Sequence, residues 1–284
     1  MKVIKKVSEM QKIALKHLRD NDEIGLVPTM GALHDGHISL IDRSVRNDDI
    51  TIVSIFVNPE QFGPNEDYLK YPRSVEKDLQ VCRKSHADYV FLPSVSEMFP
   101  EGHKTFAQVN ELQDILCGSF RKGHFRGVVT VVAKLFNISF ADRAYFGMKD
   151  FQQLRIIEKM AKDLNFRTKI VPCPVVREKE GLAMSSRNSY LSETEKKNAF
   201  EISRILKEAK ENFKIKKTDA VLAETVKKLS KIPDFKIDYA EILDFHTLQK
   251  IDKNTKKAVL AAAVWAGKTR LIDNAILIKS SRRD

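Results

Sequence analysis

Along the first 176 residues, short β-rich runs alternate with amphipathic stretches of helical period. The run "ITIVSIFVN", Ile50 to Asn58, is almost entirely apolar and β-branched, which is typical of a parallel strand buried on both faces. Four other runs predict strands: "IGLVPTM", "ADYVFLP", "DRAYFG" and "TKIVPCPVV". Helical periodicity appears at 37–46, 74–85 and 151–164, whereas "VVTVVAKLFNIS" fits either a helix or a buried run. This alternation predicts an α/β fold with a Rossmann-like, doubly wound parallel sheet.

The pattern changes after Val176. Ser192 and Glu195 form a capping box that opens a long amphipathic helix, and a second helix is expected at about 219–230. Three strand candidates then follow without helices between them: "KIDYAEIL", "KAVLAAAVWAG" and "TRLIDNAILI". We therefore expect two domains, a Rossmann-like domain over 1–176 and a smaller α+β domain over 177–284.

The net charge of +11 raises the possibility of a nucleic-acid partner. Residues 1–176 hold 25 Lys and Arg against 22 Asp and Glu, and residues 177–284 hold 24 against 16, so the excess is C-terminal. Acidic residues interrupt the basic runs, and aromatic residues are not regularly interleaved with them, which indicates solvated helix faces. A basic nucleic-acid-binding module is the alternative from a different class, and we expect no nucleic-acid partner.

The location of the protein is predicted from what the chain lacks. The N-terminal residues have no continuous apolar core like that of a signal peptide, and the longest apolar stretch, Ala258 to Ala266, is too short to cross a membrane. Cys82, Cys117 and Cys173 are scattered and odd in number, which suits a reducing compartment and small core residues. We expect a cytoplasmic protein without a membrane partner.

The stretch "PTMGALHDGH" lies where the first long strand run gives way to a helix. Ligands of doubly wound sheets bind beyond the carboxyl ends of the strands, and a helix N-terminus attracts anions. His34 and His37 are three residues apart, so both imidazoles can point at one phosphate. A capped turn with a histidine bonded to the backbone is the alternative, and the H-x-G-H spacing after a strand favours the phosphate site.

"HDGH" resembles the H-I-G-H signature of the nucleotidyltransferase superfamily, whose members transfer adenylyl groups on a Rossmann-like sheet. The second signature of that superfamily, K-M-S-K-S, resembles Met184-Ser185-Ser186-Arg187, with Ala183 in place of the first lysine. Two hydroxyls and a guanidinium suit the β- and γ-phosphates of ATP. A polar linker between domains would explain these residues equally well.

Three further stretches, "FVNPEQFGPNEDYLKYPR", "GHFRGVVTVVAKLFN" and "YFGMKDFQQL", extend the resemblance. Together with the two signatures they resemble, in order from Gly25 to Leu191, the pantothenate synthetase family of pantoate–β-alanine ligases. The resemblance implies ATP-dependent condensation of pantoate with β-alanine through pantoyl adenylate, Mg²⁺ bound through the phosphates of ATP with no protein ligand assigned, and a homodimer. Another nucleotidyltransferase, acting on a phosphate acceptor or on tRNA, is the alternative within the same superfamily.

The resemblance also implies site residues. Catalytic roles fall on His37 as proton donor and on His34, Lys149 and Arg187 at the phosphates. The segments implied to bind ATP comprise Met30, Gly31, Ala32, Leu33, His34, Asp35, Gly36 and His37; Gly147, Met148, Lys149 and Asp150; Val176, through its backbone, for adenine; and Met184, Ser185, Ser186 and Arg187.

Pantoate is implied to bind to Gln61 and Gln153. Three more residues are candidates for pantoate or β-alanine: Asn58, Tyr71 and Arg126. His124 and Arg126 are expected in a glycine-flanked turn, where Arg126 either reaches a ligand or serves the turn. Asp150 is either a metal or ribose ligand or the N-cap of the following helix.

Overall fold

The computed structural model describes residues 1–64, 66–252 and 254–279. By the density of its contacts the chain separates into two compact units, each described here in turn. The first comprises Met1–Met148 and Ile156–Pro174, and the second comprises Lys149–Arg155 and the chain from Val175 onward. The predicted domain boundary after Val176 stays a prediction. The last residues of the predicted second domain, 280–284, lie outside the described part.

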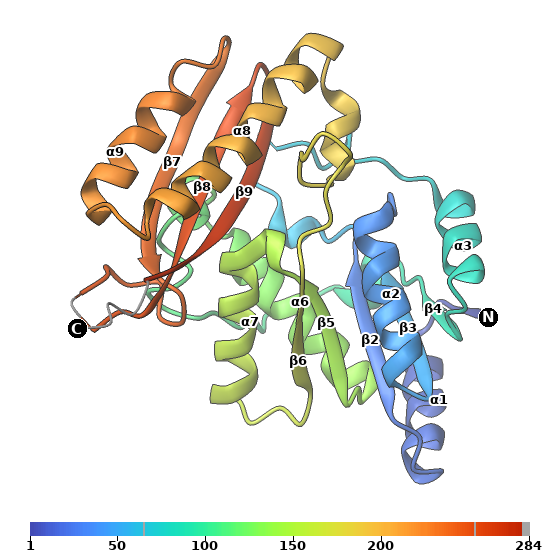
Figure 1. Cartoon of the computed structure of the whole chain (residues 1–284). Coiled ribbons are helices and arrows are strands. Elements are labelled where there is room, and N and C mark those ends of the chain that lie inside the picture. Colours follow the sequence, from blue (N-terminus) through green and yellow to red (C-terminus); the bar gives the residue numbers. More distant parts are fainter. Residues whose placement is uncertain (65, 253, 280–284) are drawn as a thin grey trace. The chain divides into compact units, whose positions relative to one another are not determined.

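Six parallel strands form the sheet of the first unit, in the order β1-β4-β3-β2-β5-β6 (Figure 1). They are β1 (Lys2–Ile4), β2 (Ile24–Thr29), β3 (Ile50–Ile55), β4 (Tyr89–Phe91), β5 (Arg143–Gly147) and β6 (Lys169–Cys173). The predicted Rossmann-like, doubly wound parallel sheet is confirmed.

The helices of this unit include one that the sequence left ambiguous. The longer ones are α1 (Val7–Arg19), α2 (Asp35–Asn47), α3 (Val75–Lys84), α6 (His124–Ser139) and α7 (Phe151–Asp163), whose first five residues belong to the second unit; the short ones are η1 (Pro59–Gln61), α4 (Val95–Met98), α5 (Cys117–Phe120) and η2 (Met148–Asp150), whose last two residues also belong there. The ambiguous run is part of α6, so His124 and Arg126 lie in the first turn of a helix and not in the glycine-flanked turn that we expected. No helix in the described part of the chain is both long and apolar enough to cross a membrane.

The strand order determines which face each helix covers. From β2 the chain proceeds through β3 to β4 on one side, whereas β5 and β6 are added on the other side of β2. Because parallel connections are right-handed, α2 and α3 cover one face, and α1 and α6 cover the other. Figure 1 shows α2 in front of β2 and β3, and α1 packs against α6.

The sheet opens at its switch point, between β2 and β5. Pairing of β2 with β3 continues to the pair Thr29–Ile55, whereas pairing of β2 with β5 is confined to Gly25–Arg143 and Leu26–Ala144. Pro28, which has no N–H group to donate, lies beyond those two pairs. The carboxyl ends of β2 and β5 are therefore not joined by backbone pairing. The segments that follow β2 and β5 both begin at this unpaired end of the two strands.

A buried polar network closes the opposite, amino end of the same two strands. The side chain of Asp48 has no exposed surface. It accepts hydrogen bonds from the Tyr145 hydroxyl at 2.6 Å, from Ser44 Oγ at 2.9 Å and from Arg143 Nη1 at 2.7 Å. A Cβ at Gly25 would lie 2.0 Å from Asp48 Oδ2, so only glycine leaves room for the carboxylate. This end of the β2–β5 pair is fixed while the other end is open.

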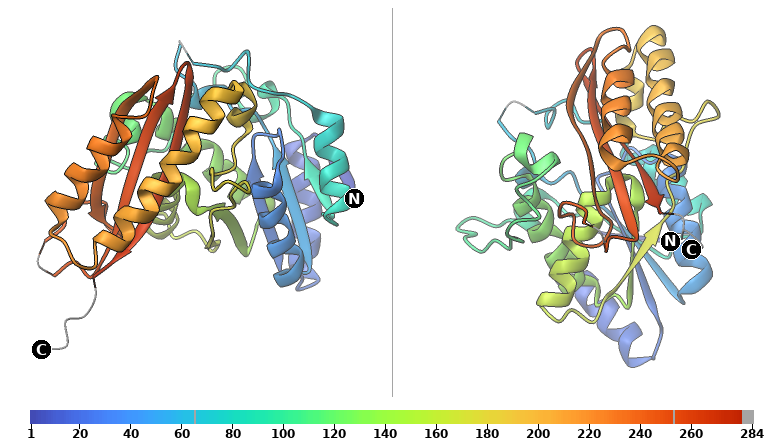
Figure 2. Two further views of the ribbon diagram at one scale, coloured as in Figure 1. Left: turned by 45° about the horizontal axis from the view of Figure 1, so that its top comes forward. Right: turned by 60° about the vertical axis from the view of Figure 1, so that its left-hand side comes forward.

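The second unit contains a three-stranded antiparallel sheet in the order β7-β8-β9. Its elements are η3 (Ser186–Tyr190), α8 (Glu193–Asn212), α9 (Thr218–Leu229), β7 (Phe235–Asp244), β8 (Lys257–Ala266) and β9 (Thr269–Ile278). The predicted capping box is present, with Ser192 Oγ and Glu195 bonded reciprocally to each other's backbone amides. Figure 2 shows both long helices along one face of the sheet.

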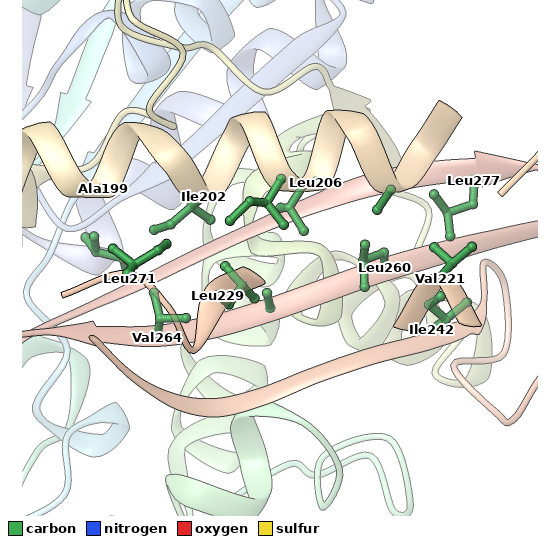
Figure 3. Close-up of a cluster of buried hydrophobic side chains, with 14 of the residues drawn as sticks. Ala199, Ile202, Leu206, Val221, Leu229, Ile242, Leu260, Val264, Leu271 and Leu277 are labelled. Atoms are coloured by element: carbon green, nitrogen blue, oxygen red, sulfur yellow. The ribbon is translucent and has the colours of Figure 1, made fainter. Parts of the chain in front are cut away.

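A single apolar cluster holds these helices on the sheet. In Figure 3, Ala199, Ile202 and Leu206 of α8 point toward Leu260, Leu271 and Leu277 of the strands. All six side chains are at most 5% exposed. Burying a leucine or isoleucine side chain contributes about 1.5–3 kcal/mol, so this layer supplies much of the stability of the unit. The predicted smaller α+β arrangement of helices and strands is confirmed.

Candidate active site

The turn after β2 is held by residues from β2 itself and from α3. Thr29 Oγ1 donates to the Ser54 carbonyl at 2.8 Å and accepts from the Gly31 amide at 3.1 Å. Gly31 has φ +82° and Ala32 has φ +50°, both in the left-handed region that glycine tolerates best. The buried carboxylate of Asp78 accepts from the amides of Ala32 and Leu33 at 2.9 and 2.8 Å. Asp78 therefore fixes a turn whose backbone is locally strained.

Both histidines of "HDGH" cap the start of α2. His34 is the N-cap, and its Nδ1 accepts from the Gly36 amide at 3.1 Å. His37 Nδ1 accepts from the His34 amide at 3.3 Å, which completes a capping box built from two imidazoles. The two ring centroids are 4.2 Å apart. The phosphate site and the capped turn, which the sequence left as alternatives, are compatible.

The capping hydrogen bonds determine the tautomer of each ring. Because Nδ1 of His34 and of His37 accepts a hydrogen bond, the proton of each neutral imidazole is on Nε2. Each ring can then donate only through Nε2–H. The N-terminal amides of α2 are further donors, and the helix dipole adds a positive potential at the same place. The arrangement suits an anion with several oxygen atoms, such as a polyphosphate.

Asn58 and Gln61 form a second group in the first unit. Asn58, only 1% exposed, donates through Nδ2 to Gln61 Oε1 and to the Gly127 carbonyl, both at 3.1 Å. Because Oε1 of Gln61 is the accepting end, its Nε2 is the donating end, and Nε2 lies 2.9 Å from Met30 Sδ. The predicted residues Met30, Asn58 and Gln61 are thus brought together, with the amide of Gln61 oriented as a donor.

The start of α6 supports this group from behind. A Cβ at Gly127 would lie 2.2 Å from the Glu60 carbonyl oxygen and 2.6 Å from the backbone nitrogen of Gln61, so α6 approaches η1 as closely as glycine allows. His124 Nδ1 donates to the Gln61 carbonyl at 2.7 Å, which places its proton on Nδ1, and Nε2 accepts from Arg121 at 3.0 Å.

Arg121 is in turn paired with the carboxylate of Glu66, to which Nε donates at 2.8 Å. Burial lowers the pKa of Arg121, and the hydrogen bond and charge of Glu66 outweigh it, so the pKa lies above its usual value. The sequence did not predict Arg121, Glu66 and Asp78 as supporting residues. Their only signal was that they fall within or between the quoted stretches, and no local pattern marks them.

Of two predicted ligand contacts, Tyr71 is buried and Arg126 is exposed. Tyr71 is buried at 5% exposure and lies edge-on to the Phe62 ring, with centroids 6.0 Å apart. Arg126 is exposed, and its guanidinium lies over the Phe106 ring, 4.5 Å from the centroid. Stacking on Phe106 favours a structural use of this arginine.

In the second unit, Lys149 lies among charged groups. It is half-buried by area, and burial of its ammonium group lowers its pKa. Asp150 and Asp273 raise the pKa, while the nearby positive charge of Arg187 lowers it further. Lys149 and Arg187, predicted from separate motifs, are thus close enough to interact. Two neighbouring cations of this kind suit a multiply charged anion.

The segment from Met184 to Arg187 directly follows a tight hairpin. The Met184 amide donates to the Val176 carbonyl at 3.0 Å, and Arg177 forms an antiparallel bridge with Ala183. Ser185 caps η3 by accepting from the Arg187 amide at 3.3 Å. Since one lone pair of the Val176 carbonyl is already used, an adenine contact to that oxygen would need the second.

Other predicted residues have simpler positions. Gln153 is half-buried in the first turn of α7, and Asp150 is exposed at the end of η2. Gly147 and Met148 end β5 and begin η2 at the switch point. The cysteines are buried, as expected. Among the residues that the structure describes, no group of three or more His, Cys, Asp or Glu side chains could hold a metal ion.

The doubly wound parallel sheet places the protein in the Rossmann-like α/β class, and the imidazoles and helix N-terminus at its switch point would suit an anionic ligand. The comparisons with known proteins narrow this class. The family model described as pantoate-beta-alanine ligase matches residues 2–276. The chain belongs to the pantoate–β-alanine ligase family.

Individual relatives cover nearly the whole chain. It is 69% identical over 279 residues to the pantothenate synthetase of Endomicrobium trichonymphae, covering 98% of this chain and 99% of the relative. A crystal structure of pantothenate synthetase from Thermus thermophilus matches with a TM-score of 0.92 and 40% identity, covering 97% of this chain and 99% of that one. The ligase from Francisella tularensis, described as complexed with beta-gamma ATP and beta-alanine, matches with a TM-score of 0.80 and 36% identity, covering 97% of each chain.

Proposed function

We propose that this protein condenses pantoate with β-alanine to pantothenate at the expense of ATP, in two steps. The pantoate carboxylate attacks the α-phosphorus of ATP, which forms pantoyl adenylate and releases pyrophosphate. The β-alanine amine then attacks the acyl carbon, and AMP leaves with the bonding electron pair. The observation that carries the proposal is the pair of imidazoles at the switch point of a chain that belongs to this family.

Catalysis in this scheme consists mainly of positioning and charge stabilisation, because negative charge develops on the α-phosphate and on the leaving pyrophosphate. We assign proton donation to His37 and phosphate binding to His34, each through Nε2–H. Lys149 and Arg187 provide full positive charges. The remaining segments for ATP are 30–37, 147–150, Val176 and 184–187, with Asp150 as either a ribose or metal ligand or a helix cap.

Gln61 and Gln153 are proposed to bind pantoate. A neutral amide orients a carboxylate but leaves its charge available for attack, whereas an arginine would neutralise the nucleophile. The donor orientation that Asn58 imposes on Gln61 supports this role. We place Tyr71 on the β-alanine side and keep Arg126 as a candidate ligand contact, although its position over Phe106 favours a structural role.

Mg²⁺ is the proposed metal. It favours oxygen ligands and usually binds to substrate phosphates with few protein groups. Bound there, it would neutralise charge on the triphosphate. The donors proposed for the phosphates are imidazoles in the first unit and cationic side chains in the second unit, and groups of both kinds suit phosphate oxygens and not a cation.

Pyrophosphate release tests the proposal. With ATP, Mg²⁺ and pantoate, the wild type should release about one equivalent of pyrophosphate per site if the adenylate stays bound. Adding β-alanine should give turnover with AMP, and His37→Ala should lose both activities. If pantoate elicits no pyrophosphate while another acid or a phosphate ester does, the substrate assignment is wrong.

Broader assignments complete the proposal. Residues 1–176 would carry most of the ATP and pantoate contacts, and 177–284 would contribute the M-S-S-R segment. We further propose a homodimer in the cytoplasm that binds no nucleic acid and no membrane. Light scattering coupled to size exclusion would test the dimer, and a single-chain mass of about 32.5 kDa in solution would contradict it.

A further inference from the structure

Two adjacent residues of β9, Asp273 and Asn274, are polar yet almost fully buried, at 4% and 6% exposure. Successive side chains of a strand point to opposite faces of the sheet. Asp273 shares its face with Leu271 and Leu277, which pack under α8, so Asn274 points to the other face. Burial of polar groups is costly unless they are hydrogen-bonded, which makes the partners of this pair informative.

On one face, Asp273 holds the hairpin that leads to the M-S-S-R segment. Its carboxylate accepts from Nη1 and Nη2 of Arg177 at 2.6 and 2.9 Å, a bidentate arrangement. Arg177 also donates to the Gly181 carbonyl at 3.1 Å and bridges to Ala183. Because Asp273 fixes the guanidinium of Arg177, it also restrains the backbone of Ala183, which directly precedes Met184.

On the other face, Asn274 holds the segment that carries Lys149. Its Nδ2 donates to the Lys149 carbonyl at 3.0 Å. The backbone N–H of Asn274 donates to Asp273 Oδ1 at 2.8 Å, which ties the Asp273 carboxylate to the backbone of Asn274. One dipeptide thus contacts the segment that contains Lys149 and the hairpin that leads to Arg187.

The charge of Asp273 has a second consequence. Lys149 and Arg187 are like charges in proximity, and among the described residues of this unit the charges that act on Lys149 are those of Asp150, Arg187 and Asp273. The two carboxylates oppose the repulsion from Arg187. Asp150 is exposed to solvent, whereas Asp273 is buried, so the charge of Asp273 is screened less.

We propose that Asp273 and Asn274 are positioning residues for adenylate formation: Asp273, through Arg177, sets the start of the M-S-S-R segment, and Asn274 sets the backbone of Lys149. The inference rests on the proposed function, in which Lys149 and Arg187 bind the triphosphate. Neither Asp273 nor Asn274 needs to contact ATP.

The test compares two isosteric substitutions. Asp273→Asn removes the buried charge, and Asp238→Asn is the matched control, because Asp238 on β7 has a side chain that is 8% exposed and pairs with Arg270 in the same sheet. Both variants should lose similar thermal stability. Only Asp273→Asn should reduce kcat/KM for ATP, by about 10- to 100-fold, the loss expected for a charged hydrogen bond, while KM for pantoate stays near the wild-type value.

The pH profile provides a readout that a structural role alone would not change. Burial and the charge of Arg187 lower the pKa of Lys149, and Asp150 and Asp273 raise it. Removing the charge of Asp273 leaves only Asp150 of these two carboxylates to raise this pKa. The alkaline limb of kcat/KM for ATP should therefore move to lower pH in Asp273→Asn and stay in place in Asp238→Asn. Asn274→Ala should reduce kcat/KM for ATP without moving the limb, since no charge is lost.

The wild-type reaction distinguishes failure of the proposed function from failure of the inference. If the wild type releases no pyrophosphate with pantoate, the proposed function fails. If it does, and Asp273→Asn has the ATP kinetics and alkaline limb of Asp238→Asn, the inference is overturned. Should Asp273→Asn fail to fold, Asn274→Ala decides, and an unchanged kcat/KM for ATP would overturn the inference.

Discussion

The imidazole rings of His34 and His37 lie with their centroids 4.2 Å apart, and each is bonded through Nδ1 to a backbone amide at the start of α2. Capping uses Nδ1 of each ring, and the proposed ligand binding would use the other nitrogen, Nε2. This division allows the two roles to be separated by substitution.

We expect His34→Asn to keep the helix cap, since asparagine is a strong N-cap residue, but to lose the Nε2–H donor. Its free energy of unfolding should stay near that of the wild type while pyrophosphate release falls. His34→Ala should lose about 1 kcal/mol of stability in addition. Urea unfolding and the pyrophosphate assay measure the two effects; full activity of His34→Asn would show that the imidazole serves only as a cap.

Asp78→Asn should destabilise the turn after β2. An amide can accept from only one of the Ala32 and Leu33 N–H groups, and its own NH₂ then faces the other. The cost of a lost buried partner is about 1–3 kcal/mol, and activity should fall because Gly31 and Ala32 are released from a strained conformation. Glu76→Gln, an exposed carboxylate on α3, is the control and should change neither stability nor activity.

Gly127→Ala should displace Gln61. The added Cβ would meet the Glu60 carbonyl at 2.2 Å, so η1 must shift away from α6. We expect a higher KM for pantoate with little change in KM for ATP. Gly63→Ala is the matched control, because its Cβ would make only ordinary contacts, from 3.6 Å, with Glu66. Equal KM values for pantoate in the two variants would contradict the proposed role of Gln61.

Tyr145 should make stability depend on alkaline pH. Burial, followed by the hydrogen bond and charge of Asp48, raises its pKa above the usual 10.0. The folded chain thus holds the phenolic proton more tightly than the unfolded chain, so this stabilisation is complete below pH 10 and is lost as pH rises above it.

Tyr145→Phe should be less stable at pH 8, because Asp48 loses a partner, and its stability should fall less steeply between pH 10 and 11. Urea unfolding at several pH values measures the slope. Tyr190→Phe, an exposed tyrosine, should keep the wild-type slope. A wild-type slope in Tyr145→Phe would exclude this titration.

The sequence predicted those parts of the fold that local pattern determines. The β-branched run before Asn58 and the periodic stretch after Ser192 gave β3 and α8. The three-residue strand β1 was too short to show alternation, and the run in α6 could not be assigned because a helix buried on most sides has no polar stripe. We predicted a glycine-flanked turn at His124 and Arg126 because Gly123 and Gly127 read as turn residues, whereas Gly127 permits helix packing.

The candidate site divides in the same way. Residues in contiguous motifs, such as His34 and His37, were found from spacing. Asp78, Arg121 and Asp273 were not, because their partners lie far away in sequence and only the tertiary structure brings them together. Positioning residues of this kind have no local signature, whereas ligand-contacting residues are grouped in loops at the ends of strands.

The bond between Asp78 and the turn after β2 also constrains the order of folding. The carboxylate lies 46 residues beyond Ala32, so it reaches the turn only once β3 and α3 have formed and docked. Strand β2 can pair with β3 earlier, through contacts closer in sequence. We therefore expect the turn after β2 to fold late, with its Ala32 and Leu33 amides gaining protection from hydrogen exchange after those of the neighbouring strands.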